Sequence, residues 1–258
     1  MLSFNASGSD PFRITAGAAE AGMSYSCVTK PGFWSSFHNQ AILAHNTSFS
    51  CGFSFDSRFG IKELGTRVAA LSLPAGKASI GALYSHFGFP DFRREMAGLA
   101  CGLKLSESLS AGVMIDYLSR KTSGEYGNSV SLTFEGGFIF KASGNVVTGI
   151  HLFNPVPNSI RKSCLPSRIR CGAGISLSNS LYAAAEAEMG TGSSIIIRTG
   201  LEYNASEKVW IRIGFSTDNN SFSIGIGYIV KSVKIDTGFA AHEKLGITST
   251  ASVSFLIR

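Results

Sequence analysis

The sequence predicts an all-β protein, an antiparallel transmembrane β-barrel of about fourteen strands with a short N-terminal helical plug. The first observation is the alternation in residues 221–230, SFSIGIGYIV, where bulky apolar side chains take every second position. The other face carries Ser and Gly instead of the Lys, Glu and Thr that cover a soluble sheet. Because this pattern recurs along most of the chain, an apolar face would surround the whole barrel. Such a face requires lipid as its solvent.

Composition is the second observation. The chain has 258 residues with 29 Gly, 19 Phe and only 16% charged residues, which fits a membrane barrel better than a soluble enzyme. No run of about 18 apolar residues predicts a transmembrane helix. A closed barrel is the other structure that leaves no unpaired backbone group in lipid. The net charge of +6 is modest, and no basic run with interleaved aromatics indicates nucleic-acid binding.

The N-terminal part is expected to be a plug, residues 1–45, with the barrel following in residues 46–258. Residues 1–30 are rich in Ala, Gly and Ser, with weak periodicity. After the Pro31-Gly32 break, apolar residues fall at helical spacing between Trp34 and Ala44, which predicts a short helix lying inside the barrel. An ordinary amphipathic helix on some other core is the alternative. The candidate plug residues are Trp34, Phe37, Asn39, Gln40, Ala41 and Leu43.

Strands follow with regular spacing and with connections that alternate in length. We expect the short turns, such as 74–76 and 143–145, on the periplasmic side and the longer loops, notably 122–128 and 155–167, outside. Both termini would then lie in the periplasm. No linker indicates a second domain. The alternating segments are residues 48–55, 64–73, 78–85, 97–105, 112–120, 130–141, 149–152, 168–177, 181–189, 195–203, 209–215, 221–230, 233–242 and 247–257.

Charge placement is the third observation. Charged residues take the Gly and Ser face of their strands, because an Arg or Lys facing mid-bilayer costs roughly 2–4 kcal/mol. Both signs occur, so we expect ion pairs in the lumen, and we expect Asn39 and Gln40 to hydrogen-bond wall groups such as Arg198 or Glu202. The predicted lumen charges are Asp116, Glu135, Glu186, Glu188, Arg198, Glu202, Arg212, Lys234 and Asp236.

Nothing in the sequence indicates an enzyme. Asp116 and Glu135, on adjacent strands, could mimic a carboxylate dyad, but no His, Ser or metal constellation accompanies them. There is no nucleophile elbow, P-loop or dinucleotide fingerprint, so we expect no catalysis and no cofactor.

The five cysteines leave at least one thiol unpaired. Cys164 and Cys171 could close a short loop by a disulfide in an oxidising compartment. The alternative is that the cysteines act as small apolar fillers. No CxxC or Cys/His spacing indicates a metal site.

The first residues, MLSFNASGSDPF, lack the basic and apolar regions of a signal peptide. Since a barrel reaches an outer membrane only by export, we expect a signal that was removed or missed. The alternative is a cytosolic protein.

The segment from Trp34 to Ala44, followed by about fourteen strands, resembles the FadL-type outer-membrane barrels. It is most similar to the PorV/PorQ-like branch common in Bacteroidota, which has a segment of the form N-(P/Q)-A-(G)-L-A before the first strand. Ile42 stands where Gly is usual. The matching positions are Asn39, Gln40, Ala41, Leu43 and Ala44, and Ala21-Gly22-Met23 resembles the family's A-G-M stretch.

The resemblance implies a bacterial outer-membrane location and two kinds of function. One is passage of hydrophobic small molecules through a plugged barrel. The other is a non-enzymatic accessory role in protein export or surface attachment, as in the type IX secretion system. A structural barrel is a third alternative. The polar lumen and short loops favour the accessory role. Expected partners are outer-membrane lipid together with a secretion-system or other outer-membrane protein, or a hydrophobic ligand.

Overall fold

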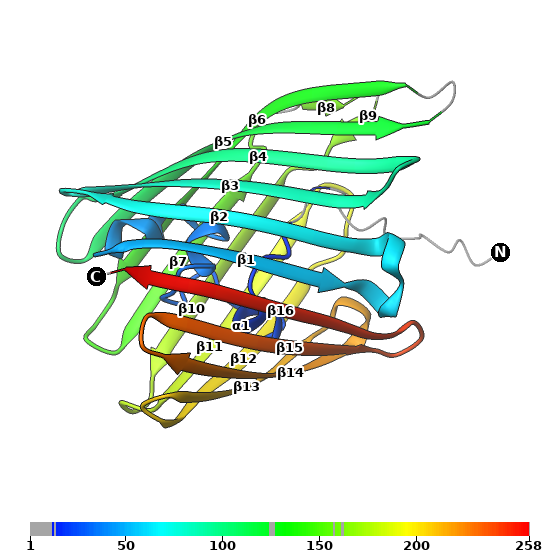
Figure 1. The fold of residues 1–258 in the computed structure, drawn as a ribbon. Helices are drawn as coiled ribbons and strands as arrows, with labels where there is room; N and C mark the ends of the chain where they lie inside the picture. Colours follow the sequence, from blue (N-terminus) through cyan, green and yellow to red (C-terminus); the bar gives the residue numbers. More distant parts are fainter. Residues whose placement is uncertain (1–11, 13, 124–126, 157, 161–162, 258) are drawn as a thin grey trace.

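The chain folds into a closed barrel of fourteen antiparallel strands that surrounds its own N-terminal segment (Figure 1). The computed structural model describes residues 12, 14–123, 127–156, 158–160 and 163–257. The predicted fold class and strand number are confirmed. The barrel strands are β1 (Phe49–Ser57), β2 (Gly65–Ala75), β3 (Ala78–Phe89), β4 (Phe92–Lys104), β5 (Leu109–Thr122), β6 (Asn128–Lys141), β7 (Val146–Phe153), β10 (Arg168–Ser176), β11 (Leu181–Gly190), β12 (Ile196–Ser206), β13 (Val209–Ser216), β14 (Ser221–Val230), β15 (Val233–His242) and β16 (Gly246–Ile257).

Closure is made by β1 and β16, which pair antiparallel from Phe49 opposite Ile257 to Ser57 opposite Ser249. Every other strand pairs with its neighbours along the chain, and the register shifts between Asn204 and Ser206, where β12 bends against β13. Closing the sheet removes both edges, so the strand backbones pair within the barrel, as a hydrocarbon environment requires.

The connections differ between the two ends of the barrel. One end carries the short turns, from 76–77 in the β2–β3 hairpin to 231–232 in the β14–β15 hairpin, and β16 also ends there (Figure 1). The other end carries the 3-10 helices η3 (Arg58–Gly60), η4 (Lys62–Leu64) and η6 (Asp218–Asn220), and the small β8 (Asn158–Ile160) and β9 (Ser163–Leu165) hairpin. The chain's C-terminal strand therefore ends on the short-turn side. The expected side of the N-terminus concerns residues 1–11, outside the described part.

Side chains along each strand point alternately to the outer and the inner face of the barrel wall. Ile224 is 56% exposed on the outside, whereas its neighbour Ser223 is 7% exposed on the inside. Exposed Phe, Ile, Leu and Val lie on the outer face of every strand except β11, whose outer face carries Ala and Met, while most Ser and Gly and most of the charged residues within the strands face inward. No helix among the described residues is long and apolar enough to cross a membrane.

The orientation of the barrel can be tested by cysteine labelling in intact cells, in a background without native cysteines. Gly192, in the β11–β12 connection, and Gly144, in the β6–β7 turn, both have open space around the position of an added side chain. We expect Gly192→Cys to react with a membrane-impermeant maleimide and Gly144→Cys to react only after the membrane is opened. The opposite labelling pattern would invert the topology.

Candidate functional site: the plugged lumen

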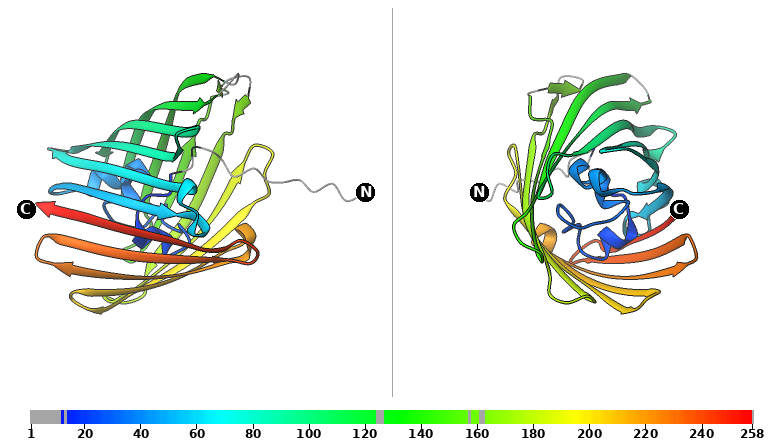
Figure 2. Two further views of the ribbon diagram at one scale, coloured as in Figure 1. Left: turned by 45° about the vertical axis from the view of Figure 1, so that its right-hand side comes forward. Right: turned by 90° about the vertical axis from the view of Figure 1, so that its left-hand side faces the viewer.

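The lumen is filled by residues 14–47, which precede β1 and lie inside the ring of strands (right view of Figure 2). This segment, here called the plug, contains α1 (Ala18–Ala21), η1 (Ser35–Phe37) and η2 (Gln40–His45). The sequence predicted one helix from Trp34 to Ala44, and that prediction is wrong in detail. Asn39 is extended, at φ −152° and ψ 108°, and its side chain accepts a hydrogen bond from Ala41 N. It therefore acts as an N-cap that ends one short helix and starts the next.

The plug residues predicted from the sequence point their side chains from the plug towards the barrel wall, where they are buried. Trp34, Phe37 and Leu43 are buried against the apolar side of the lumen, and Ala41 packs with Ile42 against Ile139. Asn39 Nδ2 donates to Val28 O at 2.8 Å and, at longer range, to Phe138 O at 3.4 Å. Its predicted partners Arg198 and Glu202 are therefore wrong. The Gln40 amide is buried without a hydrogen-bond partner among the described residues.

Glycines on the inner wall form the seat of the plug. A Cβ at Gly102 would stand 2.7 Å from Gln40 O, and one at Gly238 would stand 2.6 Å from Ala18 O. Real Cβ atoms do not approach backbone atoms this closely, so any larger residue would push the plug away. The high glycine content thus follows from a backbone-to-backbone fit. The glycines of this seat are Gly52, Gly81, Gly102, Gly112, Gly137, Gly149, Gly172, Gly174, Gly200, Gly214, Gly225 and Gly238.

One half of the inner wall carries a buried charge cluster on β10, β11 and β12. Arg170 Nη2 lies 2.7 Å from Glu186 Oε1, and Arg198 Nη1 lies 2.9 Å from Glu188 Oε2. Arg198 also reaches Glu186 at 3.3 Å, so the two Arg and two Glu side chains form one network across three strands. Since isolated buried charges are costly, the network is stable only as a unit.

The same cluster holds the plug backbone. Glu186 Oε2 accepts hydrogen bonds from Cys27 N at 3.0 Å and Val28 N at 3.1 Å. Arg170 donates to Tyr25 O at 2.9 Å and to His38 O at 3.4 Å. The wall charges therefore fasten two separate stretches of the plug.

A second cluster lies on β12, β13 and β15. Arg212 pairs with Glu202 at 2.5 Å and with Asp236 at 2.8 Å, and Lys234 lies 4.0 Å from Asp236. Lys30 of the plug joins the cluster through Glu202 at 3.4 Å. The charged residues predicted for this side of the lumen therefore all lie inside it, and they are ion-paired with one another.

The plug has its own buried ionisable groups. Burial disfavours the Glu20 carboxylate, but Lys30 and the Ser35 hydroxyl, 2.5 Å away, outweigh it and hold the pKa of Glu20 below its ordinary value. Burial and the nearby Arg170 lower the pKa of His38 to about 4. His38 is therefore neutral at physiological pH, and its Nε2, 2.8 Å from Ala16 O, carries the proton that it donates.

The inner wall of β2–β5 carries an apolar cluster, which the sequence interpretation missed. Here, inward-facing apolar residues of β2–β5 pack against Phe37, Leu43 and Trp34 of the plug. The signal was present in the sequence, since Leu83, Met96 and Met114 occupy inward positions of the alternation. We call this contact the apolar seam; its wall side consists of Val68, Ala70, Leu83, Met96, Ala100, Met114 and Leu118.

Asp116 and Glu135 lie at the border of the apolar seam. Both Asp116 carboxylate oxygens are buried without a hydrogen-bond partner among the described residues, beside Met114. Glu135 lies 2.9 Å from His151 Nε2. Glu135 is thus engaged by an imidazole, whereas Asp116 is a polar group that faces an apolar surrounding.

A cavity of about 410 Å³ with a mixed polar and apolar lining, here called the mixed cavity, opens between the plug and strands β12–β16 and β1, towards the end with the longer connections. Thr15, Asp56, Arg58, Arg198 and Thr248 contribute to its lining. Its size would suit a small ligand. Unlike the apolar seam, its lining includes charged and hydroxyl side chains beside apolar ones.

The predicted disulfide is not formed. Cys171 is a free thiol on the outer face of β10, because its position in the alternation directs it to lipid. Among the described residues, no three His, Cys, Asp or Glu side chains are grouped as metal ligands.

Comparison with known proteins finds similarity in structure alone. No protein-family model matches the chain, and no curated protein sequence matches it. Solved structures do match over nearly the full length of both chains. The chain has a FadL-like fold.

Three of these structures illustrate the similarity. The Pseudomonas aeruginosa FadL homologue is 11% identical, with a TM-score of 0.71, covering 93% of this chain and 98% of that one. The Ralstonia pickettii toluene transporter TbuX is 11% identical, with a TM-score of 0.75 and coverage of 94% and 98%. The Pseudomonas putida toluene transporter TodX is 10% identical, with a TM-score of 0.73 and coverage of 93% and 96%. The PorV/PorQ branch that the plug motif resembles finds no support here.

The glycine seat gives a matched pair of variants on β6. A Cβ at Gly137 would collide with Asn39 Oδ1, whereas Gly136 faces outward and its nearest heavy atom would be 3.3 Å away. We expect Gly137→Val to unseat the plug and raise conductance in planar bilayers, while Gly136→Val stays closed. Both should assemble, as judged by heat-modifiability on gels. Equal conductance of the two correctly folded variants would contradict this seat.

The charge cluster on β10–β12 gives a second way to release the plug from the wall. Glu186→Gln leaves Arg170 and Arg198 short of a counter-charge, and breaking a buried pair costs about 3–5 kcal/mol. We expect the plug of this variant to become sensitive to added protease. Glu107→Gln is the control, because Glu107 pairs with Lys104 on an exposed turn. Protease resistance equal to that of the control would show that the cluster does not hold the plug.

Proposed function

We propose that this protein is a bacterial outer-membrane channel for the uptake of small hydrophobic molecules, with no enzymatic activity. The observation that carries the proposal is the apolar seam, an apolar surface that runs along the plug on one side of the lumen. A molecule that leaves water for such a surface gains roughly 25 cal/mol for each Å² of apolar area buried. The toluene transporters among the structural matches are consistent with this choice.

The plug closes the pathway in this structure, since every side chain of the apolar seam is buried. Passage therefore requires the plug to move away from β2–β5. The lumen is built so that such a movement leaves the ion pairs intact, because Glu186, Arg170 and Glu202 hold the plug from the opposite wall. At its C-terminal end, just before β1, the plug is also attached to β2 and β5. Asn46 donates to Ser72 at 2.7 Å, and His45 lies 3.1 Å from Ser110.

Asp116 adds a polar element to the pathway. Its carboxyl group lies next to the apolar seam without a partner among the described residues. A passing molecule with one polar group could satisfy it, whereas a pure hydrocarbon would not. This favours hydrophobic molecules that carry a hydroxyl or amine over unsubstituted hydrocarbons.

The accessory role in protein export, favoured from the sequence, remains a prediction with less support. It rested on a polar and charged lumen and on short loops, whereas the apolar seam covers part of the inner wall. Recovery of a stoichiometric protein partner from native membranes, without dependence of uptake on the barrel, would favour it again.

Uptake can be tested with cells that express the barrel and lack their own hydrocarbon channels, using labelled toluene and benzyl alcohol. Leu83→Asp sets a charge in the apolar seam, and we expect uptake to fall at least about tenfold, which corresponds to about 1.4 kcal/mol. Thr248→Asp adds the same charge to the wall of the mixed cavity, away from the apolar seam, and should leave uptake unchanged. Uptake that is indifferent to both changes, with both barrels assembled, would contradict the proposal.

A further inference from the structure

The outer wall of the barrel is charged in only one place among its fourteen strands. On β10–β16, every outward position of the strands is uncharged, and most are apolar. The outward charged residues lie instead on four neighbouring strands, near the end with the longer connections. They are Arg67 on β2, His86 on β3, Arg93 and Glu95 on β4, and Lys121 on β5.

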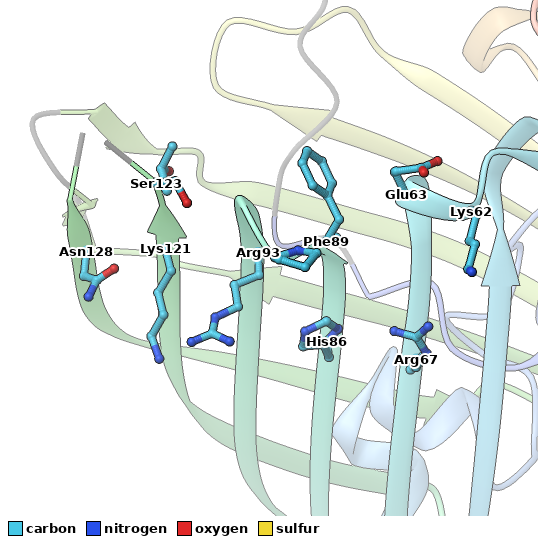
Figure 3. Close-up of a pocket in the computed structure, with 12 residues that line it drawn as sticks. Lys62, Glu63, Arg67, His86, Phe89, Arg93, Lys121, Ser123 and Asn128 are labelled. Carbon is cyan, nitrogen blue, oxygen red and sulfur yellow. The ribbon is translucent and has the colours of Figure 1, made fainter. Parts of the chain in front are cut away.

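These residues are not scattered over the wall, because most of them line one groove. Arg67 pairs in register with His86, and Arg93 with Lys121, so their side chains stand in two rows across adjacent strands. Between the rows lies a groove of about 770 Å³, here called the basic groove, which Lys62 of η4 also lines (Figure 3). Gly88, opposite Arg93, has no side chain and leaves the groove open.

The charges of the basic groove are largely uncompensated. Its lining contains Lys62, Arg67, Arg93 and Lys121 against the single acid Glu63. Lys121 lies 3.7 Å from Glu95, but Arg67 and Arg93 make no ion pair with any residue that the structure describes. Arg67 instead lies over the Phe55 ring, 5.9 Å from its centroid. Two free guanidinium groups at the membrane surface are suited to bidentate binding of phosphate.

An apolar slot continues from the basic groove towards the middle of the barrel wall. This hollow of about 340 Å³ shares Arg67 and His86 with the groove. Its floor is Ala69, which pairs in register with Phe53 on one side and Tyr84 on the other. A small residue between two aromatic rings leaves a space that fits a hydrocarbon chain.

We propose that the basic groove and the Ala69 slot together bind a phosphorylated lipid of the outer leaflet, with its phosphate on Arg67 and Arg93 and an acyl chain in the slot. The site matches such a lipid in the sign of its charge and in the depth of its parts within the membrane. The cationic groove lies at the end with the longer connections, where headgroups would be, and the apolar slot lies below it. A fatty acid carries one carboxylate, which leaves most of this positive charge unmatched. The site is on the outside of the barrel and does not depend on the transport proposal.

The test measures lipid binding to the delipidated protein by native mass spectrometry. The probe is a diphosphorylated, acylated disaccharide lipid, compared with the same lipid after its phosphates have been removed. We expect Arg67→Gln/Arg93→Gln/Lys121→Gln to bind the phosphorylated probe at least about tenfold more weakly, because several charge-assisted hydrogen bonds are lost. Lys77→Gln/Lys208→Gln/Lys231→Gln removes the same charge from turns at the opposite end and should bind normally.

A second pair of variants tests the slot without altering charge. Ala69→Leu fills the slot and should weaken binding of the acylated probe, whereas Ala97→Leu, in the same row beyond Tyr84, should not. If the triple variant fails to assemble, the comparison of Ala69→Leu with Ala97→Leu still tests whether the lipid binds at this site. Equal binding by the two triple variants, equal binding of the dephosphorylated lipid, or displacement by millimolar inorganic phosphate or oleate would each overturn the proposal.

Discussion

The need to pair every backbone group within lipid determines the rest of this structure. It forces the sheet to close, from Phe49 opposite Ile257 through all fourteen strands. A closed barrel of this size encloses more space than its own inward side chains fill. The chain fills that space with its N-terminal segment, and the inner wall is therefore shaped to receive a backbone. Gly102 and Gly238 show this directly, since plug atoms occupy the positions that a larger side chain would need.

The lumen is divided into two halves with different tasks. The β10–β15 side holds the plug by ion pairs and by hydrogen bonds from Glu186 and Arg170 to its backbone. The β2–β5 side meets it mainly with apolar contacts, which are not directional, and with two hydrogen bonds close to the start of β1, Asn46 to Ser72 and His45 with Ser110. The plug is therefore held mainly by charges on one side and mainly by apolar packing on the other.

The outer wall has the same asymmetry. The strands that carry the apolar seam inside also carry the basic groove and the Ala69 slot outside. A lipid bound there would lie on the outer side of the wall whose inner side packs against Trp34, Phe37 and Leu43 of the plug. Elsewhere the outward positions of the strands are uncharged and mostly apolar, so one side of the barrel is chemically distinguished from the rest of its circumference.

The sequence by itself determined the barrel, its strand number and the side of the wall on which Glu186, Arg212 and Asp236 lie. These features depend on strand alternation, which is local and can be counted along the chain. The break of the plug at Asn39, the pairing of Arg170 with Glu186 and the fit of the plug against both sides of the lumen were decided by the tertiary structure. They depend on which strands closure brings opposite one another and on how the plug is threaded between them, and no local pattern encodes either.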